Sequence, residues 1–286
     1  MTMLFLLYLG GVGVKAAIMP MHSWLPTAMA APTPVSALLH AVAVVKSGVF
    51  GVMRVVGFVF GPETMKVFGL HHILLVLAGT TILIASLLAL REDNLKRRLA
   101  YSTVGHLSYI VLGAALLSAG SFSGGLLHIA THATMKITLF FCAGAIYVNM
   151  HKENVSELDG IGKAMPWTMG AFTVAALGLA GIPPINGFVS KWLLGSGALE
   201  TGNVLALVIL LVSGLLNAGY LFPIIHRAFF RTSYAFDAYR EASPLMVVPI
   251  VAAALLSLLF GMWPNLCVCF YDLSVIVSRS VFGGTP

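Results

Sequence analysis

The sequence predicts an all-α polytopic membrane protein with about eight transmembrane helices, two of them broken. Hydrophobic residues make up 59% of the 286 residues and charged residues only 9%, far below the roughly 25% charged residues of soluble domains. The mean hydropathy is +0.96, and apolar stretches long enough to cross a bilayer core of about 30 Å recur along the chain. The net charge of +6 therefore reports loop orientation in a membrane and not nucleic-acid binding.

Short polar connections separate the expected spans. The spans cover approximately residues 2–19, 34–60, 69–90, 96–118, 122–149, 166–199, 203–227 and 244–272. Because no connection is long enough to hold a soluble domain, we expect a single transmembrane domain over residues 1–286. The first apolar run has no basic stretch ahead of it, so we expect it to belong to the mature protein and not to a cleaved signal peptide.

Basic residues accumulate on one side of the predicted topology. If the eight spans alternate, one face carries Arg91, Lys96, Arg97, Arg98, Lys152, Lys163, Arg227, Arg231 and Arg240, and the other carries Lys66 and Arg279. Cytoplasmic loops carry the excess of Lys and Arg. The distribution therefore predicts that the first face is cytoplasmic and that the N- and C-termini lie outside.

Prolines interrupt two of the expected spans. The segment after Lys15 contains Pro20, Pro26, Pro32 and Pro34, and the span 166–199 contains Pro183 and Pro184. Proline removes a backbone donor, and freed backbone groups at membrane depth are tolerated only where protein or a wet cavity surrounds them. Each interruption also has a lysine nearby, Lys15 before the first and Lys191 after the second. Broken helices of this kind are typical of transporters.

The span 122–149 carries the strongest functional signal. His128, His132 and Lys136 are spaced at i, i+4 and i+8 and so lie on one helical face. Lys136 falls near the middle of the span, where a lysine costs about 3 kcal/mol. Such a side chain must face protein or water, or give up its proton. We interpret the stripe as a proton relay, with packing histidines and a zinc site as the alternatives; no third metal ligand is evident.

Other ionisable residues also fall inside the expected spans. The candidates for proton transfer are Lys15, His40, Lys46 and Lys191, whereas Arg54 is expected near the exit of its span and His106 is interpreted as structural. No carboxylate falls in the middle of a span, so the row of lysines lacks balancing charge. We hypothesise that the balancing acids belong to other chains. Cys142, Cys267 and Cys269 form no ligand set, and no motif suggests a catalytic site, a metal or a bound cofactor.

Four segments closely resemble one superfamily. They are MPMHSWLPTAMAAPTPVSALLHAVAVVKSGVF, LKRRLAYSTVGHLSYIVLG, LLHIATHATMKITLFFCAGAI and GIPPINGFVSKWLL. In this order they are similar to the proton-conducting antiporter-like subunits of respiratory complex I, energy-converting hydrogenases and Mrp Na⁺/H⁺ antiporters. The resemblance implies a fold of about fourteen helices with two inverted five-helix repeats and a central polar axis that carries protons.

The resemblance also implies roles for residues of the axis. Lys15 matches the lysine of the first broken helix, and His40 and Lys46 match positions where members place a histidine or a lysine. His128 and His132 match the bridging residues of the second repeat.

Two further lysines complete the match to the axis. Lys136 matches the central lysine, and Lys191 matches the terminal residue of the second broken helix, which is Lys or Glu in different members.

The chain departs from the family pattern at its start. It begins where the seventh helix of the family begins, so the resemblance implies that residues 1–60 end the first repeat, 69–230 form the second and 244–286 form the C-terminal helix and tail. The glutamate that pairs with the Lys15 equivalent would then lie on another chain. We expect a split subunit, with a truncated accessory subunit as the alternative.

We therefore expect the C-terminal, proton-translocating half of a redox-driven complex in a prokaryotic inner or plasma membrane, without a catalytic site of its own. Its expected partners are the lipid bilayer, H⁺ and other membrane subunits, including one that supplies the missing helices and a buried Glu. The alternatives are a Mrp-type antiporter that exchanges Na⁺ for H⁺, an inorganic-carbon uptake subunit and a structural half-subunit with no transport role.

Overall fold

The computed structural model describes residues 1–233, 236, 238–266 and 269–283, and within them the chain is helical with no strand. The helices are α1 (Thr2–Lys15), α2 (Trp24–Thr27), η1 (Ala28–Ala30), α3 (Thr33–Ala41), α4 (Val44–Arg54), η2 (Val55–Phe60), α5 (Gly61–Val67), α6 (Leu70–Arg91), α7 (Leu95–Ala115), α8 (Ala119–Met150), η3 (Val155–Glu157), α9 (Ile161–Ala164), α10 (Pro166–Ala180), α11 (Asn186–Glu200), α12 (Val204–Phe230), α13 (Pro244–Met262) and α14 (Phe270–Val281).

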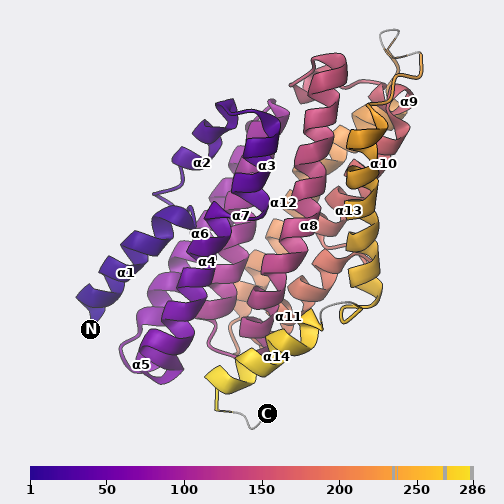
Figure 1. Cartoon of the computed structure of the whole chain (residues 1–286). Coiled ribbons are helices and arrows are strands. Elements are labelled where there is room, and N and C mark those ends of the chain that lie inside the picture. Colours follow the sequence, from indigo (N-terminus) through magenta and orange to yellow (C-terminus); the bar gives the residue numbers. More distant parts are fainter. Residues whose placement is uncertain (234–235, 237, 267–268, 284–286) are drawn as a thin grey trace.

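The long helix α8 forms the centre of the bundle. It packs against α3, α7, α10, α11, α13 and α14 (Figure 1). Helix α6 packs against α7, and α12 packs against α6 and α10. Most helices run roughly parallel or antiparallel, whereas α14 crosses beneath the lower end of α8 (Figure 1). Ser274 of α14 is joined to Ser123 of α8 by a hydrogen bond of 2.8 Å.

Five helical segments among the described residues are long and apolar enough to cross a membrane. They are Thr33–Val67, Leu70–Arg91, Ala119–Met150, Val204–Phe230 and Pro244–Met262, and the apolar helices Thr2–Lys15 and Pro166–Ala180 are shorter. A membrane-spanning, all-helical fold is therefore confirmed. The count of eight spans stays a prediction.

Two expected spans differ in extent from the helices. The span expected over 34–60 is interrupted at Val42 and Ala43, between α3 and α4, and continues as the π-helical stretch η2. The span expected over 244–272 is too long, because α13 ends at Met262 and a separate helix begins at Phe270. Pro264 follows the end of α13 by two residues, and a proline at that position prevents the helix from continuing.

The proline-rich segments separate helices. After α1 the chain turns through residues 16–23 before the short α2, with Ala17 in the left-handed region at a φ of 53°. In the range 166–199, α10 ends at Ala180 and α11 begins at Asn186. Gly181 ends α10 at a φ of 95°, a conformation that suits a residue without a Cβ atom.

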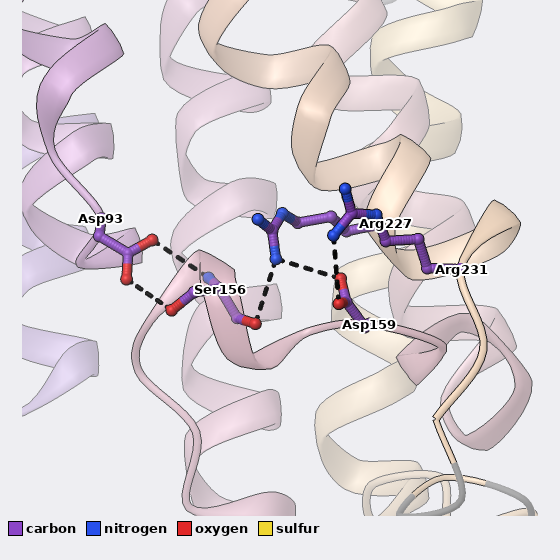
Figure 2. A network of polar contacts seen from close by, with 5 residues as sticks. All are labelled: Asp93, Ser156, Asp159, Arg227 and Arg231. Atoms are coloured by element: carbon purple, nitrogen blue, oxygen red, sulfur yellow. Dashed lines mark hydrogen bonds and ion pairs between the residues drawn. The ribbon is translucent and has the colours of Figure 1, made fainter.

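The loops rich in basic residues lie together at one end of the bundle. Main-chain hydrogen bonds join Leu95 to Glu153 at 2.8 Å and Gly160 to Arg227 at 2.9 Å. Figure 2 shows the side chains at this junction, where Ser156 donates to Asp93 and Asp159 accepts from both Arg227 and Arg231. The start of α1, α5 and α14 lie at the opposite end (Figure 1). We call the end that carries these loops the basic face.

Candidate functional site

Helix α8 presents the predicted stripe to the interior of the bundle. His128, His132 and Lys136 are each 0% exposed. Their i, i+4 and i+8 spacing stacks the three side chains along one side of the helix. Since the bundle covers α8 on several sides, the stripe faces protein and not lipid.

Three imidazole rings and one lysine form a continuous row across the bundle. Lys46 Nζ of α4 lies 2.8 Å from His132 Nδ1, and the ring of His132 lies 5.3 Å from the ring of His106 on α7. His106 Nδ1 lies 3.1 Å from His128 Nε2, with the two rings nearly parallel at 9°. His128 Nδ1 in turn lies 2.8 Å from Ser190 Oγ of α11. We call Lys46, His132, His106, His128 and Ser190 the histidine row.

The break between α3 and α4 helps to place Lys46. Lys46 belongs to the first turn of α4 and is 7% exposed, so its ammonium group is held inside the bundle. Gly48 allows α4 to approach the end of α1, because a Cβ atom there would lie 2.3 Å from the backbone nitrogen of Ala16. Only glycine fits this contact without a shift of the backbone.

Lys136 lies beside the histidine row, but its hydrogen bond goes to the main chain of α7 and not to the row. Its ammonium nitrogen donates to the carbonyl oxygen of Leu99 on α7 at 3.0 Å. This contact points Lys136 along α7 towards the basic face, where α7 begins. The structure therefore places the three residues of the α8 stripe together but gives Lys136 a separate partner.

Lys191 joins the same region from α11. Its ammonium nitrogen donates to the carbonyl oxygens of Leu179 and Ala180 at 2.6 and 3.1 Å, at the end of α10. It also lies 5.2 Å from the centre of the Tyr109 ring, a distance suited to a cation–π contact. Tyr109 packs edge-on against His106 and His128, with ring centres 5.0 and 5.5 Å away. Tyr109 thus separates Lys191 from the histidine row by one ring.

A second buried polar network links α7 with α12. The groups around Asn217 favour the amide orientation in which its oxygen accepts from Tyr109 Oη at 3.0 Å and Lys191 Nζ at 3.2 Å. Tyr220 Oη lies 2.7 Å from Ser102 Oγ. Arg98 Nη1 donates to the carbonyl oxygen of Tyr220 at 3.0 Å. These contacts form a polar seam that runs from Lys191 towards the basic face.

The sequence analysis missed several of these residues. His106 was interpreted as structural, yet it occupies the middle of the histidine row. The sequence did contain a signal for His106. Polar residues recur along α7 at the same helical spacing as the stripe on α8, at Arg98, Ser102, His106 and Tyr109. Ser190 and Asn217 had no comparable signal, since isolated polar residues are common in membrane helices.

Two predicted residues, His40 and Lys15, lie apart from both the row and the lysines beside it. His40 is 0% exposed, packs against the ring of Phe140 at 4.9 Å, and neither of its ring nitrogens has a hydrogen-bond partner among the described residues. Lys15 ends α1 on the exposed surface of the chain. The structure therefore joins Lys46, His128 and His132 directly, brings Lys136 and Lys191 close by, and leaves His40 and Lys15 apart.

The buried cations have no carboxylate partner in the described part of the chain. The four ion pairs found there are Arg97–Glu92, Lys152–Glu157, Arg227–Asp159 and Arg231–Asp159, all at the basic face. Within the same residues, no group of three His, Cys, Asp or Glu side chains is arranged to hold a metal ion. The zinc alternative for His128 and His132 therefore has no supporting geometry.

The chemistry available to the histidine row is proton transfer. A neutral imidazole has one donor and one acceptor nitrogen, so His106 and His128, in contact through their nitrogens, can pass a proton along. His132 meets His106 ring to ring at 5.3 Å, and its Nε2 atom has no hydrogen-bond partner among the described residues. A lysine at one end and a serine hydroxyl at the other extend the row in both directions. The contacts among these side chains support ion transfer.

Proteins with similar sequences are subunits of membrane-bound oxidoreductases. NADH-quinone oxidoreductase subunit N of Desulforudis audaxviator is 41% identical over 227 residues, which are 77% of this chain and 44% of that protein. F420H2 dehydrogenase subunit L of Methanosarcina mazei is 34% identical over 278 residues, 91% of this chain and 40% of that protein. The chain thus spans less than half the length of these relatives.

Solved structures show the same fold. The chain superimposes on a subunit of the membrane-bound sulfane sulfur reductase, described as an archaeal respiratory membrane complex, with a TM-score of 0.83 and 28% identity over 96% of this chain and 54% of that one. The Mrp complex of Dietzia sp. DQ12-45-1b gives a TM-score of 0.86 at 23% identity over 96% of this chain and 58% of that one.

A sequence profile described as NADH:quinone oxidoreductase/Mrp antiporter, transmembrane, matches residues 1–217. The match covers the histidine row, Lys136 and Lys191. The chain is an integral membrane protein and belongs to the antiporter-like subunit family shared by NADH:quinone oxidoreductases and Mrp antiporters.

Proposed function

We propose that this chain is the proton-translocating, C-terminal half of an antiporter-like subunit in a redox-driven membrane complex of the complex I or energy-converting hydrogenase type. The observation that carries the proposal is the histidine row, together with Lys136 and Lys191, buried inside the bundle. These groups can hold and release protons. Hydrogen bonds join Lys46 to His132 and His106 to His128, and the rings of His132 and His106 pack 5.3 Å apart.

The energetic argument supports transport over a structural role. Two lysines, Lys46 and Lys136, are nearly or fully buried without a carboxylate partner in the described residues. Each such group costs about 3 kcal/mol at the centre of a membrane helix, and an apolar side chain of similar size would avoid that cost. Ionisable residues at this depth therefore mark ion pathways in membrane proteins.

Within this proposal, Lys136 is the central proton carrier, and His128, His132 and His106 relay protons along the row. Lys46 contacts the row from α4, and Lys191 transfers the proton to one aqueous side. Lys15 pairs with a buried Glu on the chain that supplies the preceding helices, which explains its exposed position on α1. We further propose that the basic face is cytoplasmic, following the loop charges.

Redox coupling is preferred to Na⁺/H⁺ antiport because of the relatives. The proteins with 41% and 34% identity are named as subunits of NADH-quinone oxidoreductase and F420H2 dehydrogenase. The likeness to the Mrp complex at 23% identity shows the fold alone. We therefore assign the driving work to electron transfer in a neighbouring subunit.

The test is proton uptake by the assembled complex in proteoliposomes. The Lys136→Ala and Lys191→Ala variants should lose most of the gradient formed on addition of the electron donor. The Lys66→Ala variant is the matched control, because Lys66 is an exposed lysine of α5 at the opposite end. A gradient that forms equally well in all three variants would contradict the assignment, and a gradient that requires Na⁺ in place of an electron donor would favour the antiporter.

A further inference from the structure

A small cavity lies between α8, α11, α13 and α14, outside the histidine row. Its volume is about 100 Å³. Thr131, Thr134 and Asn186 form its polar wall, and Phe260 and Phe270 lie on its apolar side. Liquid water occupies about 30 Å³ per molecule, so the space suits roughly three waters.

The polar wall contains a buried acceptor that the chain does not satisfy. Asn186 is 1% exposed, and its side-chain nitrogen donates to Thr134 Oγ1 at 2.9 Å. Its side-chain oxygen accepts no hydrogen bond from the described residues. A buried polar atom without a partner is costly, and a water in a polar cavity is the usual way to satisfy it. The Asn186 oxygen therefore marks a hydration site.

Hydrogen bonds connect this wall to the histidine row. Thr131 Oγ1 lies 3.2 Å from Ser190 Oγ, and Ser190 Oγ lies 2.8 Å from His128 Nδ1. Since Thr131 also lines the cavity, a proton on His128 is two hydroxyl groups away from it. This route leaves the row through Ser190 and does not pass through Tyr109.

The cavity lies close to the end of the molecule opposite the basic face. Its outer wall includes Pro264 and Phe270, at the turn between α13 and α14, and Phe270 is 37% exposed. Trp263, at the end of α13, is 56% exposed, and tryptophan is typical of membrane–water interfaces. The outer wall of the cavity is therefore built from side chains beside an exposed tryptophan.

The close approach of α13 to the start of α11 forms the cavity. A Cβ atom at Gly261 would lie 2.0 Å from the carbonyl oxygen of Pro184 and 2.5 Å from the nitrogen of Asn186. Only glycine permits this contact. This contact packs the end of α13 against the turn that precedes α11, and Asn186 lines the cavity beside it.

We propose that this cavity holds a water cluster bound to Asn186 and that the cluster connects His128, through Ser190 and Thr131, with the aqueous phase opposite the basic face. The inference rests on the proposed function, because it gives the histidine row a second outlet beside Lys191. The cavity, here called the Asn186 cavity, takes water as its ligand. Phe260 and Phe270 line the apolar side of the cavity.

Hydration can be measured directly with Ag⁺, a small hydrated ion that reacts with thiols. In the reconstituted complex with Cys142, Cys267 and Cys269 replaced by serine, we would compare Val189→Cys, on the cavity wall, with Leu139→Cys, which is 0% exposed in the apolar core. Ag⁺ should modify the first thiol at least about tenfold faster, because an apolar core excludes the hydrated ion. It should do so when added opposite the basic face. Equal rates, or access only from the basic face, would overturn the proposal.

Transport by the intact complex provides the second readout. Asn186→Leu removes the acceptor and should slow proton translocation about tenfold if a dry wall blocks the route, whereas Asn186→Ser should retain most of it. Native gel electrophoresis would confirm assembly of both variants. If Lys136→Ala leaves transport intact while Val189→Cys still reacts, the proposed function fails and the hydrated cavity stands. If the two Asn186 variants translocate protons equally fast, the outlet is overturned.

Discussion

The contact between Lys46 and His132 joins α4 to the histidines of the row. The nitrogens lie 2.8 Å apart, and both residues are buried. A neutral lysine can donate to the imidazole, and a protonated one can transfer its proton, so the two side chains act as one unit. Residues that act as a unit show non-additive effects when they are substituted.

Substitutions of this pair should therefore not add. Lys46→Met and His132→Leu should each slow proton translocation about tenfold or more, and the double variant should be no slower than the worse single one. The measurement is the initial rate of acidification in proteoliposomes at equal electron-transfer drive. Rates that multiply across the two substitutions would indicate that the residues contribute to separate routes.

At this scale the sequence could predict the stripe but not its partners. Helical spacing alone brought out His128, His132 and Lys136, and the structure places all of them in the interior. The same rule applied to α7 would have found His106. The partner of Lys136 could not be predicted, since it is the carbonyl oxygen of Leu99, and every residue carries such a group. The role of each predicted residue in transport stays a prediction.

Close packing between neighbouring helices depends on a few glycines. Gly261 allows α13 to touch the start of α11, and Gly187 lies where a Cβ atom would approach the carbonyl oxygen of Gly178 to 2.0 Å. Both contacts surround the turn that separates α10 from α11. This turn positions Lys191 as well as Asn186, so its packing sets the geometry of both sides of the site.

Gly261→Ala should destabilise the protein. The added methyl group would collide with backbone atoms of Pro184 and Asn186, and overpacking of this kind costs about 1–3 kcal/mol. The matched control is Gly170→Ala in α10, where a Cβ atom meets nothing within 4 Å; alanine there should be neutral or stabilising by up to about 1 kcal/mol. The measurement is the thermal unfolding midpoint in detergent. Equal midpoints would refute the close contact.

Prolines mark the turn between α10 and α11, whereas the interruption between α3 and α4 has no such mark; that two membrane spans are broken helices stays a prediction. Helix α10 ends and α11 begins around Pro183 and Pro184, as the residue types indicate. The interruption at Val42 and Ala43 has neither proline nor glycine. Backbone propensity could not reveal it, because packing of α3 and α4 against their neighbours determines where that helix breaks. The length of α13 was overestimated because the apolar stretch continues past its end.

For the whole molecule, the basic face is a network of loops held by ion pairs. Glu157 illustrates how it is fixed. The Lys152 ammonium at 3.0 Å and the backbone N–H of Asn154 hold the pKa of the Glu157 carboxyl below its usual range. A lowered pKa means that the contact stabilises the loop at pH values above about 4.3, the ordinary carboxyl value, and that this stabilisation is lost as the pH falls through the native pKa.

Glu157→Gln should therefore loosen the loop at neutral pH and change little in acid. Hydrogen exchange of the Asn154 amide, corrected for intrinsic pH dependence, should be slower in the unmodified chain at pH 7. The two rates should converge only as the pH falls below the native, lowered pKa of Glu157, where the carboxyl becomes protonated. A difference that persists unchanged in acid would show that charge is not the cause.

The charge balance of the whole chain points to other subunits. In the described residues, every ion pair lies at the basic face, and the buried lysines have no acid among them. The composition predicted this imbalance before the fold was known, since each Asp and Glu falls in a loop or at a span end. That another chain supplies a balancing acid stays a proposal, because the sequence records one partner of each contact only.

The number of protons moved per electron transferred tests the central claim most directly. In the assembled complex in proteoliposomes, Lys66→Ala should keep the proton-to-electron ratio of the unmodified complex. Lys136→Ala should lower this ratio, whether electron transfer keeps its usual rate or slows. The loss follows if the buried lysine of α8 carries the proton. An unchanged ratio in an assembled Lys136→Ala complex would contradict the account.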